Sequence, residues 1–476
     1  MPSRKLNLSI FASAILLVSL IIPVLAENQS IETLLAYLKS PVTETREDAA
    51  RKLGERRARD PHVVDALAVA ARRDEDKDVR IEAIKSLGLI KDLSATADMI
   101  DALTDANKEV RHITVRSLVA LYTEHNIDFI TNHRKGWNRL NPFMDTDDRE
   151  IIEPYAAVDP AIIKALGETA RSDFDREVRL AAIRGLGVLR GRDAVPQLAD
   201  ALNADQNVRV DVIRAMIKIG DPESGRYLVP FFRDSNEEVR TQAIFATGFL
   251  KYRGAVQPLM SLYGRGEESK GALKTMKDVF TGSAPPRDKA ALYALALIGD
   301  DRAEQIFLEN LNDKDSERRR YSVEGLARIA DKKYADQLSR MLLIEKNGDV
   351  KLALNWALYK MGEREQIRNI APKLSTGQSE QAYGYLMETE YISDLYPYAR
   401  SANLEVRHKT IEILGKIGDK ATIAELEPIA TTSGVETANN ATLAIKRIEW
   451  RIAGKPRASD EVLRKQTRPR RAANPQ

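Results

Sequence analysis

The sequence contains no cysteine among its 476 residues and only five histidines. The lack of cysteine excludes disulfides, thiol nucleophiles and thiolate metal sites, and it suits a protein that works in an oxidising compartment. A large surplus of either charge is also absent, because 73 Lys and Arg residues stand against 70 Asp and Glu residues. A nucleic-acid-binding fold usually carries a basic surplus. We therefore expect no nucleic-acid partner.

Long hydrophobic runs are absent except at the beginning of the chain. Arg4 and Lys5 precede a nearly continuous apolar stretch from Leu8 to Leu25, and Glu27 follows Ala26. This order is typical of a signal peptide, so we expect residues 1–26 to be removed and the mature protein to be periplasmic in a bacterium or secreted. The alternative is an uncleaved membrane anchor, because an apolar stretch of this length barely spans a bilayer.

What the chain has in abundance is one short pattern, repeated. Residues 175–205, DREVRLAAIRGLGVLRGRDAVPQLADALNAD, read as a helix, a turn and a second helix, and the pattern then begins again. Taking Val178 as the reference position, equivalent valines occur at Val79, Val110, Val208, Val239, Val350 and Val406. Most of these valines are followed by arginine. Such self-similarity predicts a repeat architecture from 27 to 453.

Each repeat carries the signals of a helix start and a helix end. Three residues before the reference position stands an Asp or an Asn, which predicts an N-cap. These residues are Asp76, Asn107, Asp175, Asp205, Asn236, Asp315, Asn347 and Asn403. Apolar residues then recur every three or four positions, as one helical face requires. Gly220, Gly299, Gly362 and Gly418 follow the stripe, where a left-handed residue ends a helix.

A single hairpin of this kind buries too little apolar surface to offset the entropy of ordering its residues. Stacking on neighbouring hairpins supplies the missing burial. We therefore predict an all-α fold, an α-solenoid or superhelix of about eleven to twelve stacked helical hairpins.

The pattern resembles the HEAT family, and most closely the HEAT-like repeats of phycobilisome lyases. The residues that carry the resemblance are the recurring Asp/Asn-x-x-Val-Arg, the Ala-x-x-x-Leu-Gly of Ala182, Leu186 and Gly187, and Ala194-Val195-Pro196 at the start of a second helix. The resemblance covers about residues 44–453. It implies a helical solenoid, but repeats of this type serve very different functions.

Two insertions and a tail interrupt the period. The first insertion, near 124–158, contains Trp137, Phe143 and Tyr155, and the second lies near 263–286. An insertion on one face of a solenoid is often a binding element; the alternative is that the first insertion covers the solenoid's own apolar edge. The tail, 454–476, is rich in Pro and Arg and is expected to be disordered. A membrane partner is expected only through this tail or an uncleaved leader.

Enzymatic interpretations find little support in the residues. Deoxyhypusine hydroxylases resemble this architecture and hold two irons with His-Glu pairs, and His112 and His408 stand at the matching positions. However, Ile113 and Lys409 replace the glutamates that a di-iron oxidoreductase needs. A bilin lyase-like role conflicts with the export leader. The segment 264–273 lacks the lysine of a phosphate loop, and 145–150 lacks the glycine of a calcium loop. We therefore expect no catalytic residue, no metal and no cofactor.

The remaining interpretation is an exported, non-enzymatic scaffold. Stacked hairpins expose one helix layer over a long surface, on which many modest contacts to a protein partner add up. We expect the second helices to provide this layer. The candidate partner-binding residues are Asp98, Asp101, Gln197 and Asp200, together with Trp137, Phe143 and Tyr155 of the first insertion.

Overall fold

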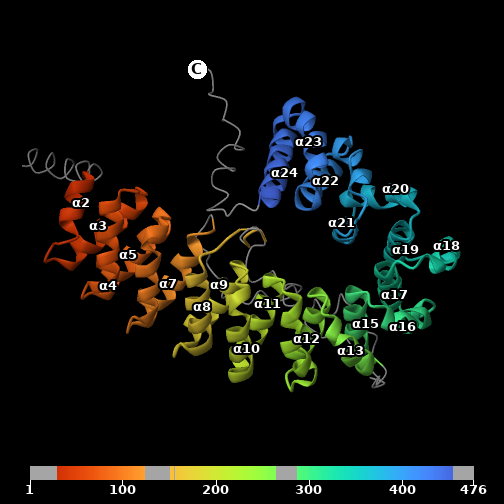
Figure 1. Ribbon diagram of the computed structural model, residues 1–476, viewed down its shortest axis with the longest axis horizontal. Coiled ribbons are helices and arrows are strands. Elements are labelled where there is room, and N and C mark those ends of the chain that lie inside the picture. Colours follow the sequence, from red (N-terminus) through yellow and green to blue (C-terminus); the bar gives the residue numbers. More distant parts are fainter. Residues whose placement is uncertain (1–28, 124–150, 155, 264–286, 454–476) are drawn as a thin grey trace, which may run out of the picture. The chain divides into compact units, whose positions relative to one another are not determined.

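A computed structural model describes residues 29–123, 151–154, 156–263 and 287–453 (Figure 1). The chain divides into two compact units, which meet in the sequence between Leu121 and Tyr122. In the described residues of unit 1 the helices are α2 (Ile31–Tyr37), α3 (Thr43–Glu55), α4 (Pro61–Arg73), α5 (Lys77–Ile90), α6 (Thr96–Asp101) and α7 (Lys108–Ala120). A 3₁₀ turn, η2 (Ala102–Thr104), extends α6.

Unit 2 continues the same alternation of helices. Its first half contains α8 (Pro160–Ser172), α9 (Arg176–Val188), α10 (Val195–Ala204), α11 (Arg209–Ile219), η7 (Pro222–Tyr227), η8 (Val229–Arg233), α12 (Glu237–Phe249), α13 (Val256–Tyr263) and α15 (Arg287–Ile298). Its second half contains α16 (Glu304–Asn310), α17 (Ser316–Ile329), α18 (Ala335–Ile344), α19 (Gly348–Lys360), α20 (Ile367–Ile370), η13 (Ala371–Ser375), α21 (Ser379–Met387), η15 (Tyr398–Arg400), α22 (Leu404–Ile417), α23 (Lys420–Thr432) and α24 (Val435–Ala453). Within the described residues every regular element is helical, and the all-α solenoid is confirmed.

The helices of each unit form two rows. The helices that begin at the recurring Val-Arg pattern stack on one another and form the motif row: α3, α5 and α7 in unit 1, and α9, α11, α12, α15, α17 and α19 in unit 2. The intervening helices, such as α4, α6, α8, α10, α13, α16 and α18, form the second row. In unit 2 the second-row helices α10, α13, α16 and α18 lie on the outer side of the stack (Figure 1).

The helices pair differently from the hairpins that the sequence pattern suggested. The closely packed pairs join a second-row helix to the motif helix that follows it. They include α4 with α5, α8 with α9, α10 with α11, α13 with α15, α16 with α17 and α18 with α19. Residues 175–205 therefore contain the end of one packed pair and the beginning of the next.

The predicted N-caps are confirmed at every position named from the sequence. In each case the Asp or Asn side chain accepts a hydrogen bond from a backbone N–H in the first turn, as Asn107 does from Glu109 and Val110. The other caps are Asp76, Asp175, Asp205, Asn236, Asp315, Asn347 and Asn403. These caps satisfy N–H groups that have no partner inside the helix.

The helix-ending glycines are confirmed in three cases and wrong in one. Gly220, Gly299 and Gly362 have positive φ angles of 71°, 65° and 110°. Gly418 is extended, with φ −61° and ψ 162°. The reason is that α23 begins only two residues later at Lys420, so the chain turns directly into the Asp419 cap instead of forming a left-handed end.

The glycine of the Leu-Gly pattern has a packing role. A Cβ atom at Gly248 would lie 2.9 Å from the Cα atom of Ala294, and a Cβ atom at Gly415 would lie 2.9 Å from the Cα atom of Ala444. Both distances are shorter than side chains tolerate. The absence of a side chain there lets α12 approach α15, and α22 approach α24, closely enough to share one core.

The two insertions, apart from residues 151–154 and 156–158 of the first and residue 263 of the second, lie outside the described residues. The same holds for the leader, the tail and the candidate residues Trp137, Phe143 and Tyr155. At the end of the first insertion, Ile152 is buried, and its N–H donates to the Val188 carbonyl at 3.1 Å. The Arg190 Nε donates to the Ile152 carbonyl at 2.9 Å. These residues cover the end of α9. The role of the first insertion stays a prediction. Among the described residues, no helix is both long and apolar enough to cross a bilayer.

Candidate binding surfaces

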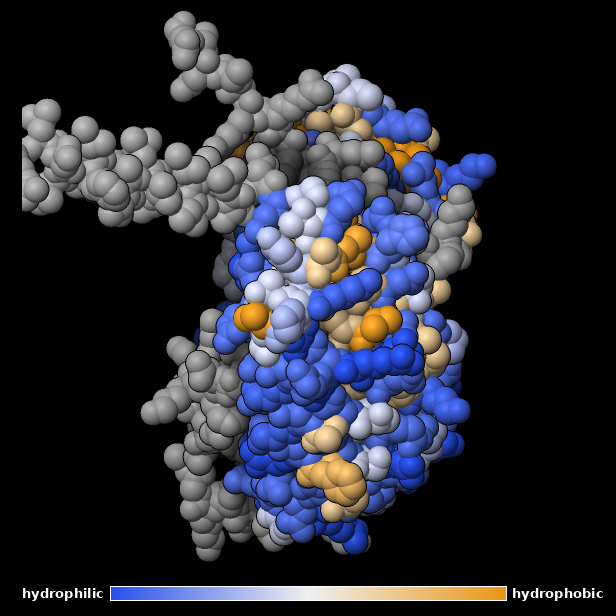
Figure 2. Space-filling model, turned by 90° about the vertical axis from the view of Figure 1, so that its left-hand side faces the viewer, coloured by the Kyte–Doolittle hydropathy of each residue, from blue (hydrophilic) through white to orange (hydrophobic). Residues whose placement is uncertain are grey.

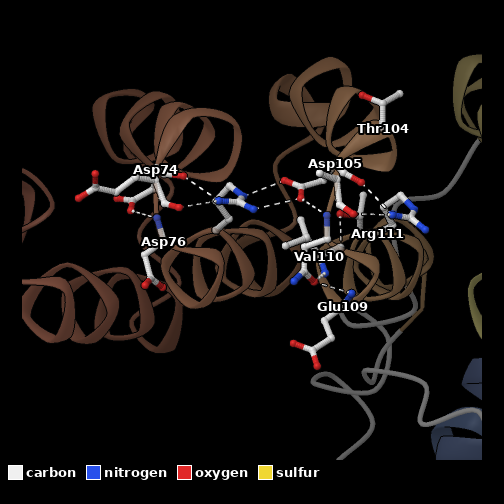
Figure 3. A network of polar contacts seen from close by, with 12 residues as sticks. Asp74, Asp76, Thr104, Asp105, Glu109, Val110 and Arg111 are labelled. Atoms are coloured by element: carbon white, nitrogen blue, oxygen red, sulfur yellow. Dashed lines mark hydrogen bonds and ion pairs between the residues drawn. The ribbon is translucent and has the colours of Figure 1, made fainter.

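The recurring arginine after each Val connects neighbouring repeats. The Arg80 guanidinium donates to both carboxylate oxygens of Asp105, at 2.7 Å and 3.1 Å, and also to the carbonyl of Asp74 at 2.8 Å. Asp105 in turn accepts the N–H of Asn107 at 2.8 Å, which fixes the turn before α7. Figure 3 shows these turns, with Asp74 in one and Asp105 in the next. One arginine therefore ties its own turn to the turn of the following repeat.

This arrangement, here called the arginine ladder, recurs along both units. Each pair joins the arginine of one motif helix to a carboxylate in the next turn, 25 to 28 residues ahead. The pairs are Arg46–Asp74, Arg80–Asp105, Arg179–Asp205, Arg209–Asp234 and Arg319–Glu345. Burial alone would raise the pKa of Asp74, but hydrogen bonds from Arg46 and from the Asp76 N–H bring the net pKa below its ordinary value. The repeated polar residues are thus structural, as their recurrence in copy after copy predicts.

The polar residues predicted on the second helices lie in the second row, in two separate places. In unit 1, Asp98 on α6 pairs with Arg72 of α4 at 2.8 Å, and the Asp101 side chain is 68% exposed. In unit 2, Gln197 on α10 lies 3.5 Å from Glu168 of α8, and Asp200 is exposed. Asp98 and Gln197 therefore connect neighbouring second-row helices, whereas Asp101 and Asp200 face solvent. Their role in partner binding stays a prediction.

Of the two histidines considered as metal ligands, His408 has its Nδ1 3.7 Å from the Glu436 carboxylate. The His408 Nε2 lies 2.9 Å from the hydroxyl of Thr437, so this histidine links α22 to α24. This contact is a structural hydrogen bond between neighbouring helices. Among the described residues, no group of three or more His, Asp or Glu side chains could hold a metal ion. The segments 145–150 and 264–273 lie outside these residues.

Unit 2 contains a second polar feature that the sequence analysis did not single out. It is here called the arginine–aromatic cluster and comprises Tyr293, Arg320, Tyr321, Glu324, Arg328, Trp356, Tyr385 and Glu388. These residues come from α15, α17, α19 and α21, and Glu388 follows directly after α21. The cluster forms because the ends of several helices converge. Glu388 accepts from Arg328 at 2.9 Å and from Lys251, just after α12, at 3.4 Å.

Aromatic stacking and hydrogen bonds hold the inside of the cluster together. The rings of Trp356 and Tyr385 stack with centroids 4.3 Å apart, and the Arg328 guanidinium lies over Trp356 at 4.9 Å. The Tyr385 hydroxyl donates to the Glu324 carboxylate at 2.6 Å. Stacked and cation–π contacts of this kind are strongest when they are removed from water. Trp356 and Tyr385 are both buried, so the cluster fixes α21 against α17 and α19.

The charges of the cluster are set by burial and by each other. Burial alone would raise the pKa of Glu388, but Arg328 and Lys251 bring the net pKa below its ordinary value. Burial raises the pKa of Tyr321 well above its ordinary value. Glu388 therefore stays an anion, and the Tyr321 hydroxyl stays a proton donor, over the whole physiological range of pH.

The sequence did contain one signal for the cluster. The pattern Val-Arg is replaced by three successive arginines, Arg318, Arg319 and Arg320, and the ladder uses only the second of them. The neighbours that complete the cluster lie up to about two repeats away in the sequence. Only the stacking of the helices shows that they meet.

Comparison with known proteins supports the repeat assignment. A family model described as HEAT repeats matches residues 31–119 and 163–248. These two segments match the HEAT-repeat pattern. They coincide with the regions in which the arginine ladder and the Asp or Asn caps are most regular. No curated protein matches the chain.

Several solved structures are similar to the chain at low identity. The complex of CpcE and CpcF of phycocyanin lyase from Nostoc sp. PCC7120 is 20% identical, with a TM-score of 0.28, and the match covers 63% of this chain and 94% of that chain. An engineered protein is 18% identical, with a TM-score of 0.33 and coverages of 89% and 99%. The karyopherin Kap121p bound to the extreme C-terminus of the protein phosphatase Cdc14p is 12% identical, with a TM-score of 0.40 and coverages of 95% and 55%.

Proposed function

We propose that this HEAT-repeat protein is an exported, non-enzymatic scaffold that binds a protein partner on its second row of helices. The polar residues of the motif row that recur most regularly are engaged in the arginine ladder. The motif helices also bury most of their surface: in α19, every residue from Leu352 to Tyr359 is buried. The second row is therefore the layer that offers side chains to a partner.

One helix of the second row carries the proposal. Helix α18 has an apolar C-terminal half, yet Leu338 is its only buried residue. The adjacent side chains of Leu343 and Ile344 are 86% and 78% exposed. Large aliphatic residues exposed side by side are typical of a protein-binding site when polar residues surround them. Figure 2 shows another face of the molecule, which is mainly hydrophilic with small, separate hydrophobic areas.

Site-specific cross-linking tests this proposal. A photo-cross-linking residue at Leu343 or at Asp200 should capture one and the same protein from the envelope or the medium. The matched control is Lys351, which is exposed on the neighbouring motif helix α19. Capture from Lys351 alone, or different proteins from each second-row position, would contradict binding on this row. Deleting residues 125–157 shows whether the first insertion contributes.

Export and the absence of catalysis have their own tests. N-terminal sequencing of the mature protein should begin at Glu27, whereas a chain that still begins at Met1 or Pro2 would favour a membrane anchor. Metal analysis of the purified protein should find no stoichiometric iron. Two equivalents of iron per chain would overturn the proposal in favour of the di-iron oxidoreductase, the alternative in which His112 and His408 would take part.

A further inference from the structure

The arginine–aromatic cluster contains hydrogen-bond donors without acceptors. Tyr321 and Trp356 are fully buried, and neither the Tyr321 hydroxyl nor the Trp356 Nε1 has a hydrogen-bond partner in the part of the chain that the structure describes. The Nε of Arg320 is also buried and has no hydrogen-bond partner among the described residues. Buried donors are nearly always paired in folded proteins, so three in one cluster call for an explanation.

Arg320 differs from the two arginines that precede it. Arg318 pairs with Asp288, and Arg319 forms a bidentate ion pair with the Glu345 carboxylate at 2.9 Å and 3.0 Å. The nearest carboxylate oxygen to Arg320 is that of Glu324, at 3.6 Å from Nε, which is beyond hydrogen-bond distance. That carboxylate already accepts from Tyr385. Within the described residues, the guanidinium of Arg320 is therefore not committed to any hydrogen bond.

The charges indicate what kind of group would complete the cluster. Glu324 and Glu388 already have partners in Tyr385 and Arg328, and Arg320 has only the 3.6 Å approach of Glu324. Arginine binds planar oxyanions through paired hydrogen bonds. A carboxylate would give Arg320 the same kind of ion pair that Arg318 and Arg319 already have.

We propose that Arg320 and Tyr321 form a binding site for a carboxylate group. The carboxylate oxygens accept from the guanidinium of Arg320, which lies over the Tyr321 ring at 4.9 Å, and from the hydroxyl of Tyr321. The Arg320 side chain is 22% exposed and Tyr293 beside it is half-buried, so a ligand reaches Arg320 first. The carboxylate belongs either to a free small acid or to an acidic peptide. This site is independent of the scaffold proposal, because it lies on the motif row and its test uses different residues.

The experiment compares the full-length protein with three variants, using sodium acetate and a tetraglutamate peptide as probes. Acetamide at equal ionic strength is the uncharged control, and inorganic phosphate is the competing anion. Binding is measured by calorimetry, and stability by thermal unfolding. The variants are Tyr321→Phe, Arg320→Met and, as a matched control, Tyr359→Phe, whose lost hydroxyl contacts Thr389 and Asp394 outside the site.

We expect acetate to bind and to raise the unfolding temperature, while acetamide does neither. Tyr321→Phe should weaken acetate binding about tenfold to a hundredfold, as loss of a hydrogen bond to a charged group predicts. Without a probe this variant should be at least as stable as the parent, because it removes an unpaired buried hydroxyl. Arg320→Met should abolish binding. Tyr359→Phe should lower stability and leave acetate affinity unchanged.

The possible sources of the carboxylate give different results. Equal affinity for acetate and tetraglutamate identifies a free acid, and much tighter binding of tetraglutamate identifies an acidic peptide. Three outcomes overturn the proposal: no binding of either probe, tighter binding of phosphate than of acetate, or Tyr321→Phe less stable than the parent without a probe. The last result would show that the hydroxyl already has a partner in the free protein.

Discussion

Replacing Arg80 with methionine should destabilise the packing between two neighbouring repeats of unit 1. The side chains of Arg80 and Asp105 are only 14% and 12% exposed, so the variant leaves a largely buried carboxylate without its counter-charge. Removing one partner of a buried ion pair typically costs about 3–5 kcal/mol. Two backbone carbonyls, those of Asp74 and Glu75, also lose their donor. We expect a loss near this range, confined mainly to α5, α6 and α7.

The assay must report on a few repeats, because each solenoid repeat contacts only its neighbours and can open locally. Hydrogen exchange followed by mass spectrometry provides this resolution. Peptides from residues 74–120 should exchange between about two and four orders of magnitude faster, since every 1.4 kcal/mol corresponds to a factor of ten. Peptides from α22 to α24 should exchange at the rate of the parent protein.

Lys77 is the matched control for Arg80. It lies in the first turn of the same helix and also connects two repeats, through Glu109 at 2.9 Å, but both side chains are well exposed. Exposed ion pairs contribute little to stability, so Lys77→Met should leave exchange nearly unchanged. The double variant Arg80→Met with Asp105→Asn should recover much of the loss, because an amide oxygen can still accept from the Asn107 N–H. Equal effects of Arg80→Met and Lys77→Met would refute the view that the ladder holds the repeats together.

Further predictions concern pH and packing. Burial raises the pKa of Asp74 and Asp205, but hydrogen bonds from the ladder arginines and from the backbone N–H groups of Asp76 and Asn207 together lower it more, so the folded pKa lies below the unfolded value of 3.8. The contribution of these two carboxylates to the free energy of unfolding is therefore present above about pH 4 and is lost as the pH falls through the folded pKa. Urea unfolding midpoints measured from pH 7 to pH 2 should fall accordingly. A flat profile would contradict this. Gly325→Ala places a Cβ atom 2.5 Å from the Phe307 ring and should lower the free energy of unfolding by about 1–3 kcal/mol through overpacking. In Gly384→Ala the new Cβ atom meets no atom within 4 Å, and because Gly384 lies in a helix the variant should be more stable by roughly 0.5–1 kcal/mol. Chemical denaturation of both variants checks this pair, and a stable Gly325→Ala protein would show that the ring can move away.

The repeat and its caps could be predicted from the sequence because they depend on local physics. An Asp or Asn before Val-Arg caps a helix through contacts only two or three residues away, and Asn107 and Asn347 do so as expected. The apolar stripe likewise depends on the helical period alone. The end at Gly418 was predicted wrongly because its conformation depends on how soon the next helix begins, which the glycine itself does not encode.

The sequence by itself determined that this chain is a solenoid of helical repeats, since a hairpin that cannot bury its own apolar face must stack on another. Only the tertiary structure decided what the recurring arginines do and where α21 lies. Arg80 reaches Asp105 across 25 residues, and Tyr385 reaches Glu324 across 61. Such contacts depend on the small rotation between successive repeats, which accumulates over several hairpins and is not visible in any one of them. The packing of α17 against α19 brings Arg320, Tyr321 and Trp356 into one cluster in unit 2.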